Sequence, residues 1–265
     1  MFDRFDRHIN YLRISVTDKC NMRCVYCMPA EGVPMLRHED MLSFEEICAF
    51  TREAVSLGIR KVRLTGGEPL VRRDIVTLVA MLSKIPGIED FAMTTNGALL
   101  RDYAGALAAA GLHRVNVSLD SCDPDYYAMI TRGGDIHQVI AGIEAALAAG
   151  LTPVKLNCVI QHSPEEPHAR SVFEYGRSMG LEVRFIRRMN LSQGEFSTVI
   201  GGAGGDCEHC NRLRLSCTGL VRPCLFSDLE FNIRALGAEA AIREAVAMKP
   251  RCGGVSSAFF HAIGG

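Results

Sequence analysis

The chain has 265 residues, of which 48% are hydrophobic, and its formal net charge is −1 at pH 7. This length allows one large α/β domain, or a domain with an appendage. The near-neutral charge argues against a nucleic-acid partner, so an anionic ligand would need a local basic cluster. The charged N-terminus has no apolar signal core and no apolar run is long enough to span a bilayer, so we expect no membrane partner.

Strand-like and helix-like segments alternate from residue 11 to residue 187. The expected strands are 11–17, 61–65, 91–95, 114–119, 154–160 and 182–186. The expected helices are 44–57, 72–84, 98–110, 136–149 and 166–179. Ser43 and Glu46 form a capping box before the first helix. Six consecutive β–α units predict an α/β fold in which helices cover a parallel sheet, namely an open, partial β/α barrel over residues 1–189.

The rhythm breaks after residue 189. Residues 190–206 are rich in glycine and predict a loop or linker. This segment is followed by a cysteine-rich hairpin, a helix near 237–248 and a Gly-Gly end. We therefore expect a separate small C-terminal region over 190–265.

One face of the expected strands is polar and basic. In 11–17, Leu12 and Ile14 share a face, and Arg13 lies on the other. Packed barrel interiors are usually filled with Val, Ile and Leu. Because buried unpaired charges are costly, we interpret the polar face as a ligand-filled cavity with affinity for anions. The alternatives are internal salt bridges, or strands that are solvated on one side.

The chain has eleven cysteines, many for its length. Without a secretion signal, such thiols are more often metal ligands or small buried residues than disulfides, and we expect a cytoplasmic protein with at least six ligand cysteines. The first group is CNMRCVYC, with Cys20, Cys24 and Cys27 on the loop after the first strand. Three thiolates can hold three irons of a [4Fe–4S] cluster and leave the fourth iron open, whereas zinc would need a fourth ligand. Tyr26 would shield this cluster.

The second group is CEHCNRLRLSCTGLVRPC, over residues 207–224. Its alternation predicts a hairpin with Cys217 at the tip, roughly 20 Å from the base at 3.3 Å per residue. Cys217 therefore cannot share a metal with Cys207, Cys210 and Cys224. This predicts a second three-cysteine centre rather than a four-cysteine zinc clip. The remaining cysteines are expected to be buried or incidental thiols: Cys48, Cys122, Cys158 and Cys252.

The first cysteine spacing resembles that of the radical S-adenosylmethionine (SAM) superfamily, whose open iron binds SAM and delivers the electron that splits it into methionine and a 5′-deoxyadenosyl radical. LTGGEP (64–69), TTNG (94–97) and NVSLD (116–120) resemble its SAM-contacting segments. The resemblance implies SAM contacts at Tyr26, Gly66, Gly67, Glu68, Thr94, Ser118 and Met189.

Runs along nearly the whole chain, such as NYLRISVTDKCNMRCVYCMP and CNRLRLS, resemble the MoaA family of GTP 3′,8-cyclases. The resemblance implies a second [4Fe–4S] cluster on Cys207, Cys210 and Cys224 whose open iron contacts the GTP purine. Arginine forks suit phosphate oxygens. The implied GTP-binding residues are Arg13, Lys61, Arg63, Lys155, Arg184, Arg212 and Arg214.

The implied activity is that of a lyase in molybdenum cofactor biosynthesis. The radical takes hydrogen from C3′ of GTP, and C3′ then attacks C8 to give 3′,8-cyclo-7,8-dihydro-GTP. The catalytic residues implied are Arg13, Arg212, Arg214, Gly264 and Gly265, with the two glycines threading a narrow approach to the site. The resemblance also implies an electron donor such as flavodoxin or ferredoxin, and it is compatible with a homodimer.

Three departures from the family pattern keep an alternative open, and one of them is that the region after Cys224 is compressed. The segment between Met189 and Cys207 is short for the family, and Arg187 stands where the pattern usually has an acid. The alternative is a related radical SAM maturase that acts on a peptide or another nucleotide, with an auxiliary second cluster. An iron–sulfur electron carrier or a zinc-binding interaction protein would have no use for GGEP, NVSLD and a basic cavity together.

Overall fold

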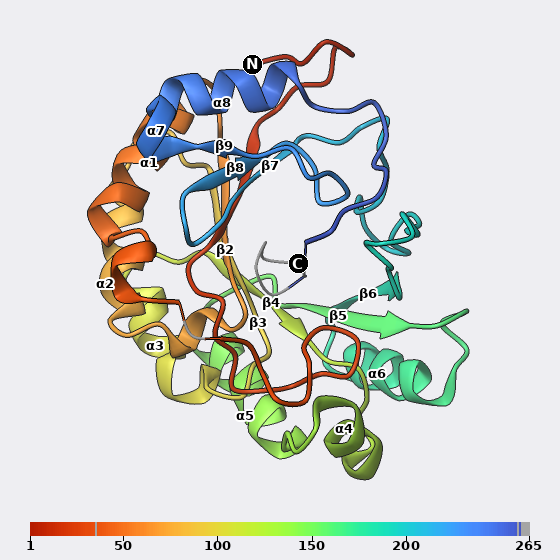
Figure 1. The fold of residues 1–265 in the computed structure, drawn as a ribbon. Coiled ribbons are helices and arrows are strands. Elements are labelled where there is room, and N and C mark those ends of the chain that lie inside the picture. The colour runs from red at the N-terminus through yellow and green to blue at the C-terminus, as the bar shows by residue number, and fades with distance from the viewer. Residues whose placement is uncertain (35, 259, 261–265) are drawn as a thin grey trace.

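The computed structural model describes residues 1–34, 36–258 and 260. It confirms the predicted alternation, and helices lie along the outside of a curved sheet (Figure 1). The strands of the alternation are β1 (Tyr11–Ser15), β2 (Lys61–Thr65), β3 (Asp90–Thr95), β4 (Arg114–Ser118), β5 (Lys155–Ile160) and β6 (Glu182–Arg187). The predicted helices are α1 (Phe44–Ser56), α2 (Ile75–Leu82), α3 (Leu100–Ala109), α5 (Ile136–Ala148) and α6 (Pro167–Ser178).

The sheet has the strand order β6-β5-β4-β3-β2-β1-β7-β8-β9. The strands β1 to β6 are parallel, and β7 (Arg212–Leu215) pairs with β1 in the same direction. The C-terminal region thus extends the barrel sheet at its β1 edge. In this register Arg13 lies opposite Arg63 on one side and Arg214 on the other.

The predicted hairpin is present. Strand β7 pairs antiparallel with β8 (Leu220–Arg222), and Gly219 turns the chain between them with a φ of 86°. Cys217 lies in this connection and is buried, away from the hairpin base. The hairpin is followed by β9 (Phe231–Asn232) and α8 (Ala238–Ala247), and α8 packs against α1. The N-terminal residues run beside α8 (Figure 1).

Sequence reasoning missed two short helices, α4 (Pro124–Thr131) and α7 (Ile233–Leu236). The start of α4 had a local signal, because Asp123 caps it through the backbone N–H of Tyr126 and Pro124 occupies its first turn. The apolar face of the strands carries Leu12, Ile14 and their neighbours, which are fully buried under the helices. None of the described helices is long and apolar enough to cross a membrane.

Candidate active site

A cavity of about 360 Å³ is lined by residues of every strand from β1 to β7. Both cysteine triads and three of the predicted arginines line it: Cys20, Cys24, Cys27, Cys207, Cys210, Cys224, Arg13, Arg212 and Arg214. The two triads are far apart in sequence. They line the same cavity because β7 pairs with β1. Cys20, Cys24 and Cys27 follow the carboxyl end of β1, where β/α folds place active sites, whereas Cys207 and Cys210 precede β7 and lie beside the amino end of β1.

The loop that carries the first triad rests on the glycine turn after β2. Gly67 donates its backbone N–H to Thr17 O at 2.8 Å, and Glu68 donates to Lys19 O at 2.8 Å. A Cβ atom at Gly66 would lie 2.5 Å from Thr17 O, and one at Gly67 would lie 2.4 Å from Lys19 O. The Gly-Gly pair is therefore needed because the two backbones touch here.

The end of α4 braces the same loop from the other side. Arg23 N donates to Thr131 O at 3.1 Å, and Val25 N donates to Ile130 O at 2.9 Å. The Arg132 guanidinium adds a bond to Met28 O at 2.9 Å. The helix that sequence reasoning missed thus helps to fix the positions of the first three thiols.

The thiols of the first triad suit a cationic ligand. Burial, followed by the negative charges of Asp120 and the neighbouring cysteines, raises the pKa of Cys24 to about 12. Burial and the charge of Cys20 raise the pKa of Cys27 to about 11. Three crowded, buried thiolates are stable only beside a positive centre, and coordination to metal deprotonates a thiol outright. This donor set fits an iron–sulfur cluster.

A buried lysine, Lys249, lies near the second triad. Burial alone would raise the pKa of Cys210, but the charges of Lys249 and Arg212 lower it. Lys249 is fully buried, lines the cavity and donates to the carbonyls of Arg212, at 2.7 Å, and Pro223. Sequence reasoning missed Lys249, which resembles any lysine near a helix C-terminus.

The cysteines outside the triads do not all behave as expected. Cys48 and Cys158 are buried, and Cys122 is half-buried. Cys252 is different, because it is exposed and its Sγ lies 3.4 Å from Cys207 Sγ. Cys252 is therefore not a buried thiol, because the chain returns to the second triad after α8.

Most of the residues predicted to contact SAM lie together in the cavity wall: Tyr26, Gly66, Gly67, Thr94, Ser118 and Met189. Thr94 Oγ1 is buried and has no hydrogen-bond partner among the described residues, so a polar ligand group would satisfy it. Glu68 is not among the described lining residues. Its carboxylate accepts from Leu70 N, Thr95 Oγ1 and Asn96 N at 3.0, 2.7 and 2.6 Å.

Asn96 is a lining residue that the sequence did not single out within TTNG. Its Nδ2 atom lies 2.7 Å from Asn21 Oδ1 and 3.8 Å from Cys20 Sγ. Asn96 therefore connects the end of β3 to the first triad.

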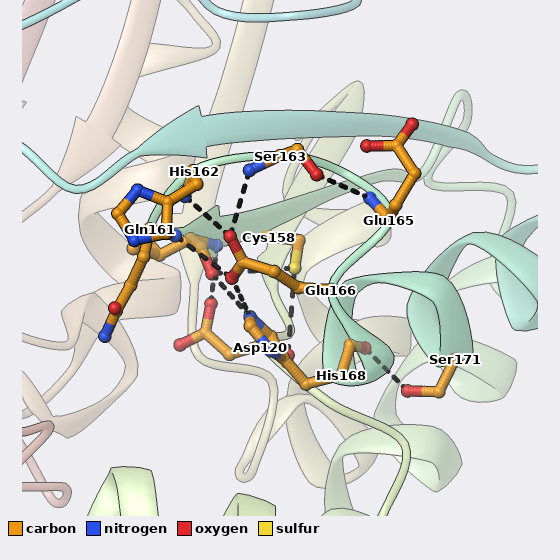
Figure 2. Close-up of polar contacts among 10 residues, drawn as sticks. Asp120, Cys158, Gln161, His162, Ser163, Glu165, Glu166, His168 and Ser171 are labelled. Carbon is orange, nitrogen blue, oxygen red and sulfur yellow. Dashed lines mark hydrogen bonds and ion pairs between the residues drawn. The ribbon is translucent and has the colours of Figure 1, made fainter.

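Tyr26 is held by the ends of β4 and β5. Its hydroxyl donates to Asp120 Oδ2 at 2.6 Å, and Val159 N donates to Asp120 Oδ1 at 2.8 Å. Figure 2 shows Asp120 beside the turn after β5, where the Glu166 carboxylate accepts the backbone N–H groups of residues 161–163. His168 lies 3.5 Å from this carboxylate and 3.2 Å from Val159 O. This network fixes the wall of the cavity behind Tyr26.

Burial and mutual repulsion lower the pKa values of the arginines near the cavity. Burial and then the charges of Arg13 and Arg212 lower the pKa of Arg214 to about 9. Burial likewise lowers the pKa of Arg63, beside Arg13 in register, to about 10. Arg63 lies over the Tyr11 ring at 5.6 Å from its centroid. Such a group of buried cations favours an anionic ligand.

The remaining predicted GTP residues are not among the described residues that line the cavity. Lys61 is exposed at the start of β2. Lys155 Nζ and Arg184 Nη2 each lie 2.6 Å from the Glu182 carboxylate. The salt-bridge interpretation of the polar face therefore holds at this edge of the sheet. Gly264 and Gly265 lie outside the described residues.

Comparison with known proteins identifies the class. Residues 14–171 match the model of the radical SAM superfamily. The fold is also similar to SuiB of Streptococcus suis bound to S-adenosylmethionine, at a TM-score of 0.62 and 14% identity over 92% of this chain and 64% of that chain. It is similar to anSMEcpe with bound AdoMet and Kp18Cys peptide, at a TM-score of 0.62 and 14% identity over 92% and 81% of the two chains. The fold and the first triad are those of a radical SAM enzyme.

Curated relatives identify the family. The GTP 3′,8-cyclase of Petrotoga mobilis is 42% identical over 88% of this chain and 86% of its own length. The GTP 3′,8-cyclase of Moorella thermoacetica is 42% identical over 98% and 95% of the two chains. The chain belongs to the GTP 3′,8-cyclase family. The Moorella alignment spans 307 positions, so that relative has residues that this 265-residue chain lacks.

Proposed function

We propose that the protein is a GTP 3′,8-cyclase of molybdenum cofactor biosynthesis that converts GTP to 3′,8-cyclo-7,8-dihydro-GTP. One observation carries the proposal: a single cavity is lined by two cysteine triads and by arginines that include Arg13, Arg212 and Arg214. A SAM-cleaving enzyme with a neutral substrate would not need the arginines. An anion-binding protein would not need the thiols.

The residues divide the work as follows. Cys20, Cys24 and Cys27 would hold one [4Fe–4S] cluster, and the second triad would hold another. When bound, the first cluster and SAM supply the electron and the radical chemistry, while the protein positions the substrate and excludes water. Arg13 and the two arginines of β7 bind the triphosphate, for which their forked geometry is suited.

The proposal includes further expectations for the whole enzyme. An electron donor such as flavodoxin or ferredoxin reduces the first cluster. The enzyme works in the cytoplasm, where the thiols stay reduced before they bind iron. A homodimer is compatible with the proposal, and the oligomeric state is measurable by light scattering of the reconstituted protein.

A second candidate function is modification of a peptide or another nucleotide. Two observations favour it: the Moorella relative has residues that this chain lacks within the aligned region, and Glu182 already pairs with Lys155 and Arg184. The similarity to a peptide-bound structure concerns the fold alone. The relatives at 42% identity favour the cyclase.

The test is anaerobic incubation of the reconstituted protein with SAM, a strong reductant and GTP. We expect 5′-deoxyadenosine and the cyclised nucleotide in matching amounts, measured by mass spectrometry. Formation of 5′-deoxyadenosine without consumption of GTP would reject the cyclase proposal and favour the second candidate. Iron analysis is a separate check, because two clusters require about eight irons per chain and one requires about four.

A further inference from the structure

A fourth thiol touches the second triad from outside the cavity. Cys252 Sγ lies 3.4 Å from Cys207 Sγ. The three cysteines of the triad line the cavity, whereas Cys252 is exposed and stands apart from the described residues that line it. Cys252 is therefore accessible to dissolved oxidants, and Cys207 is the ligand cysteine in contact with it.

The contact is built into the fold. A buried arginine, Arg7, ties both segments together, because its Nη1 donates to Cys207 O at 2.7 Å and to Arg251 O at 3.0 Å. Its Nη2 donates to Pro250 O at 2.7 Å. Arg7 is itself held by the buried carboxylate of Asp3, at 2.7 Å. One guanidinium thus fixes the backbone beside both sulfur atoms.

We propose that Cys207 and Cys252 form a reversible disulfide when peroxide destroys the second cluster. The cluster is part of the proposed function, and the inference rests on it. In the step, two S–H bonds and the O–O bond of hydrogen peroxide break, one S–S bond forms and two water molecules leave. The two sulfurs are oxidised and the peroxide is reduced.

The geometry and the chemistry of cysteine both favour this pair. A disulfide requires the sulfurs at about 2.05 Å, so the two side chains must approach by roughly 1.4 Å from their 3.4 Å contact. Without a neighbouring thiol, a sulfenic acid on Cys207 is oxidised further to sulfinic acid, which ordinary thiols do not reduce. With Cys252 in contact, the sulfenic acid is captured as a disulfide, which a thiol reductant opens again.

The test begins with reconstituted full-length protein, treated anaerobically with hydrogen peroxide until the cluster absorbance is lost. Free thiols are then alkylated, and the protein is digested with trypsin and with a protease that cleaves after glutamate. Arg251 precedes Cys252, and Glu208 lies between Cys207 and Cys210, so these cuts place the three cysteines on different peptides. We expect the main cross-linked species to join Cys207 to Cys252.

Two variants complete the test. Cys252→Ser should lose the cross-link, accumulate sulfinic acid on Cys207 and recover less iron after reductant, iron and sulfide are added back. Cys122→Ser, a matched thiol away from the triad, should behave like the unmodified chain. A main cross-link between Cys207 and Cys210, or equal iron recovery by Cys252→Ser, would overturn the proposal.

Iron content before peroxide treatment separates this inference from the proposed function. About eight irons without the cross-link reject the thiol pair and leave the two-cluster proposal standing. If the protein holds about four irons and still forms the cross-link, the second cluster is rejected. The proposed protection of that cluster's ligands by the thiol pair is then rejected as well.

Discussion

Gly67→Ala is the sharpest test of how the first triad is held. The added Cβ would lie 2.4 Å from Lys19 O, 2.6 Å from Lys19 C and 2.7 Å from Asp18 O. All three atoms belong to backbone, which cannot rotate away as the tip of a side chain would. The loop before Cys20 must therefore move, and the 2.8 Å bond from Glu68 N to Lys19 O is lost or lengthened.

The size of the effect follows from these two changes. Overpacking at a closely packed position costs about 1–3 kcal/mol. A lost hydrogen bond adds about 1 kcal/mol. In a chain of this size, each kcal/mol lowers the thermal midpoint by about 2–4 °C, so we expect a drop of roughly 5–15 °C in the cluster-free protein. Because the displaced loop carries the thiols, iron uptake by the first triad should also fall.

The assay compares Gly67→Ala with Gly105→Ala. A Cβ atom at Gly105, within α3, has nothing within 4 Å. Alanine is favoured over glycine inside a helix by about 1 kcal/mol, so this control should be slightly stabilised and keep its iron. Thermal unfolding followed by circular dichroism, together with iron analysis after reconstitution, measures both effects. An unchanged midpoint and full iron content in Gly67→Ala would refute the contact argument.

Three further predictions concern the charged groups. Arg212→Ala and Arg214→Ala should each weaken GTP binding about 10- to 100-fold while SAM cleavage continues uncoupled, as calorimetry and 5′-deoxyadenosine assays would show. Lys249→Met should lower iron content toward that of one cluster, because a buried cation near Cys210 is lost. Burial raises the pKa of Glu68 from 4.5 to about 7, so the folded state holds this proton more tightly than the unfolded state. Stability of the cluster-free protein should therefore be greatest below pH 4.5 for this group and fall as pH rises to about 7, and Glu68→Gln should remove that slope.

Each of these predictions has an outcome that contradicts it. Unchanged GTP affinity in both arginine variants would remove them from the substrate site, with Arg243→Ala on the exposed side of α8 as the neutral control. Full iron content in Lys249→Met would mean that Lys249 only supports the backbone. An identical pH slope in Glu68→Gln would assign the titration to another group.

The sequence was sufficient for features that local signals encode. Period-two alternation located the strands, and the spacing of Cys20, Cys24 and Cys27 located the first triad, because residues on one short loop must lie close together. The Arg-Leu-Arg-Leu alternation even identified the hairpin that separates Cys217 from its neighbours. Long-range pairings had no such signal: the contact of β7 with β1 and the return of Lys249 to the second triad depend on how the chain closes on itself.

The basic face was also only half predictable. Arg13, Lys155 and Arg184 look alike in sequence, because each alternates with apolar residues on a strand. The difference comes from Glu182, which begins β6 and lies within 2.6 Å of both Lys155 and Arg184. A carboxylate on a neighbouring strand is invisible until the register is known, so the sequence could not show that Lys155 and Arg184 are paired with Glu182.

The pairing of Lys155 and Arg184 with Glu182 bears on where the triphosphate would bind. At the β5–β6 edge the cations already have Glu182, and an added phosphate would compete with it. Across β2, β1 and β7, Arg63, Arg13 and Arg214 stand side by side in register, and burial with mutual repulsion lowers their pKa values. A bound triphosphate relieves that repulsion, which makes its binding favourable there and raises the same pKa values. The triphosphate should therefore lie over β1 and β7, where the second triad begins, and leave the first triad and Thr94 to SAM.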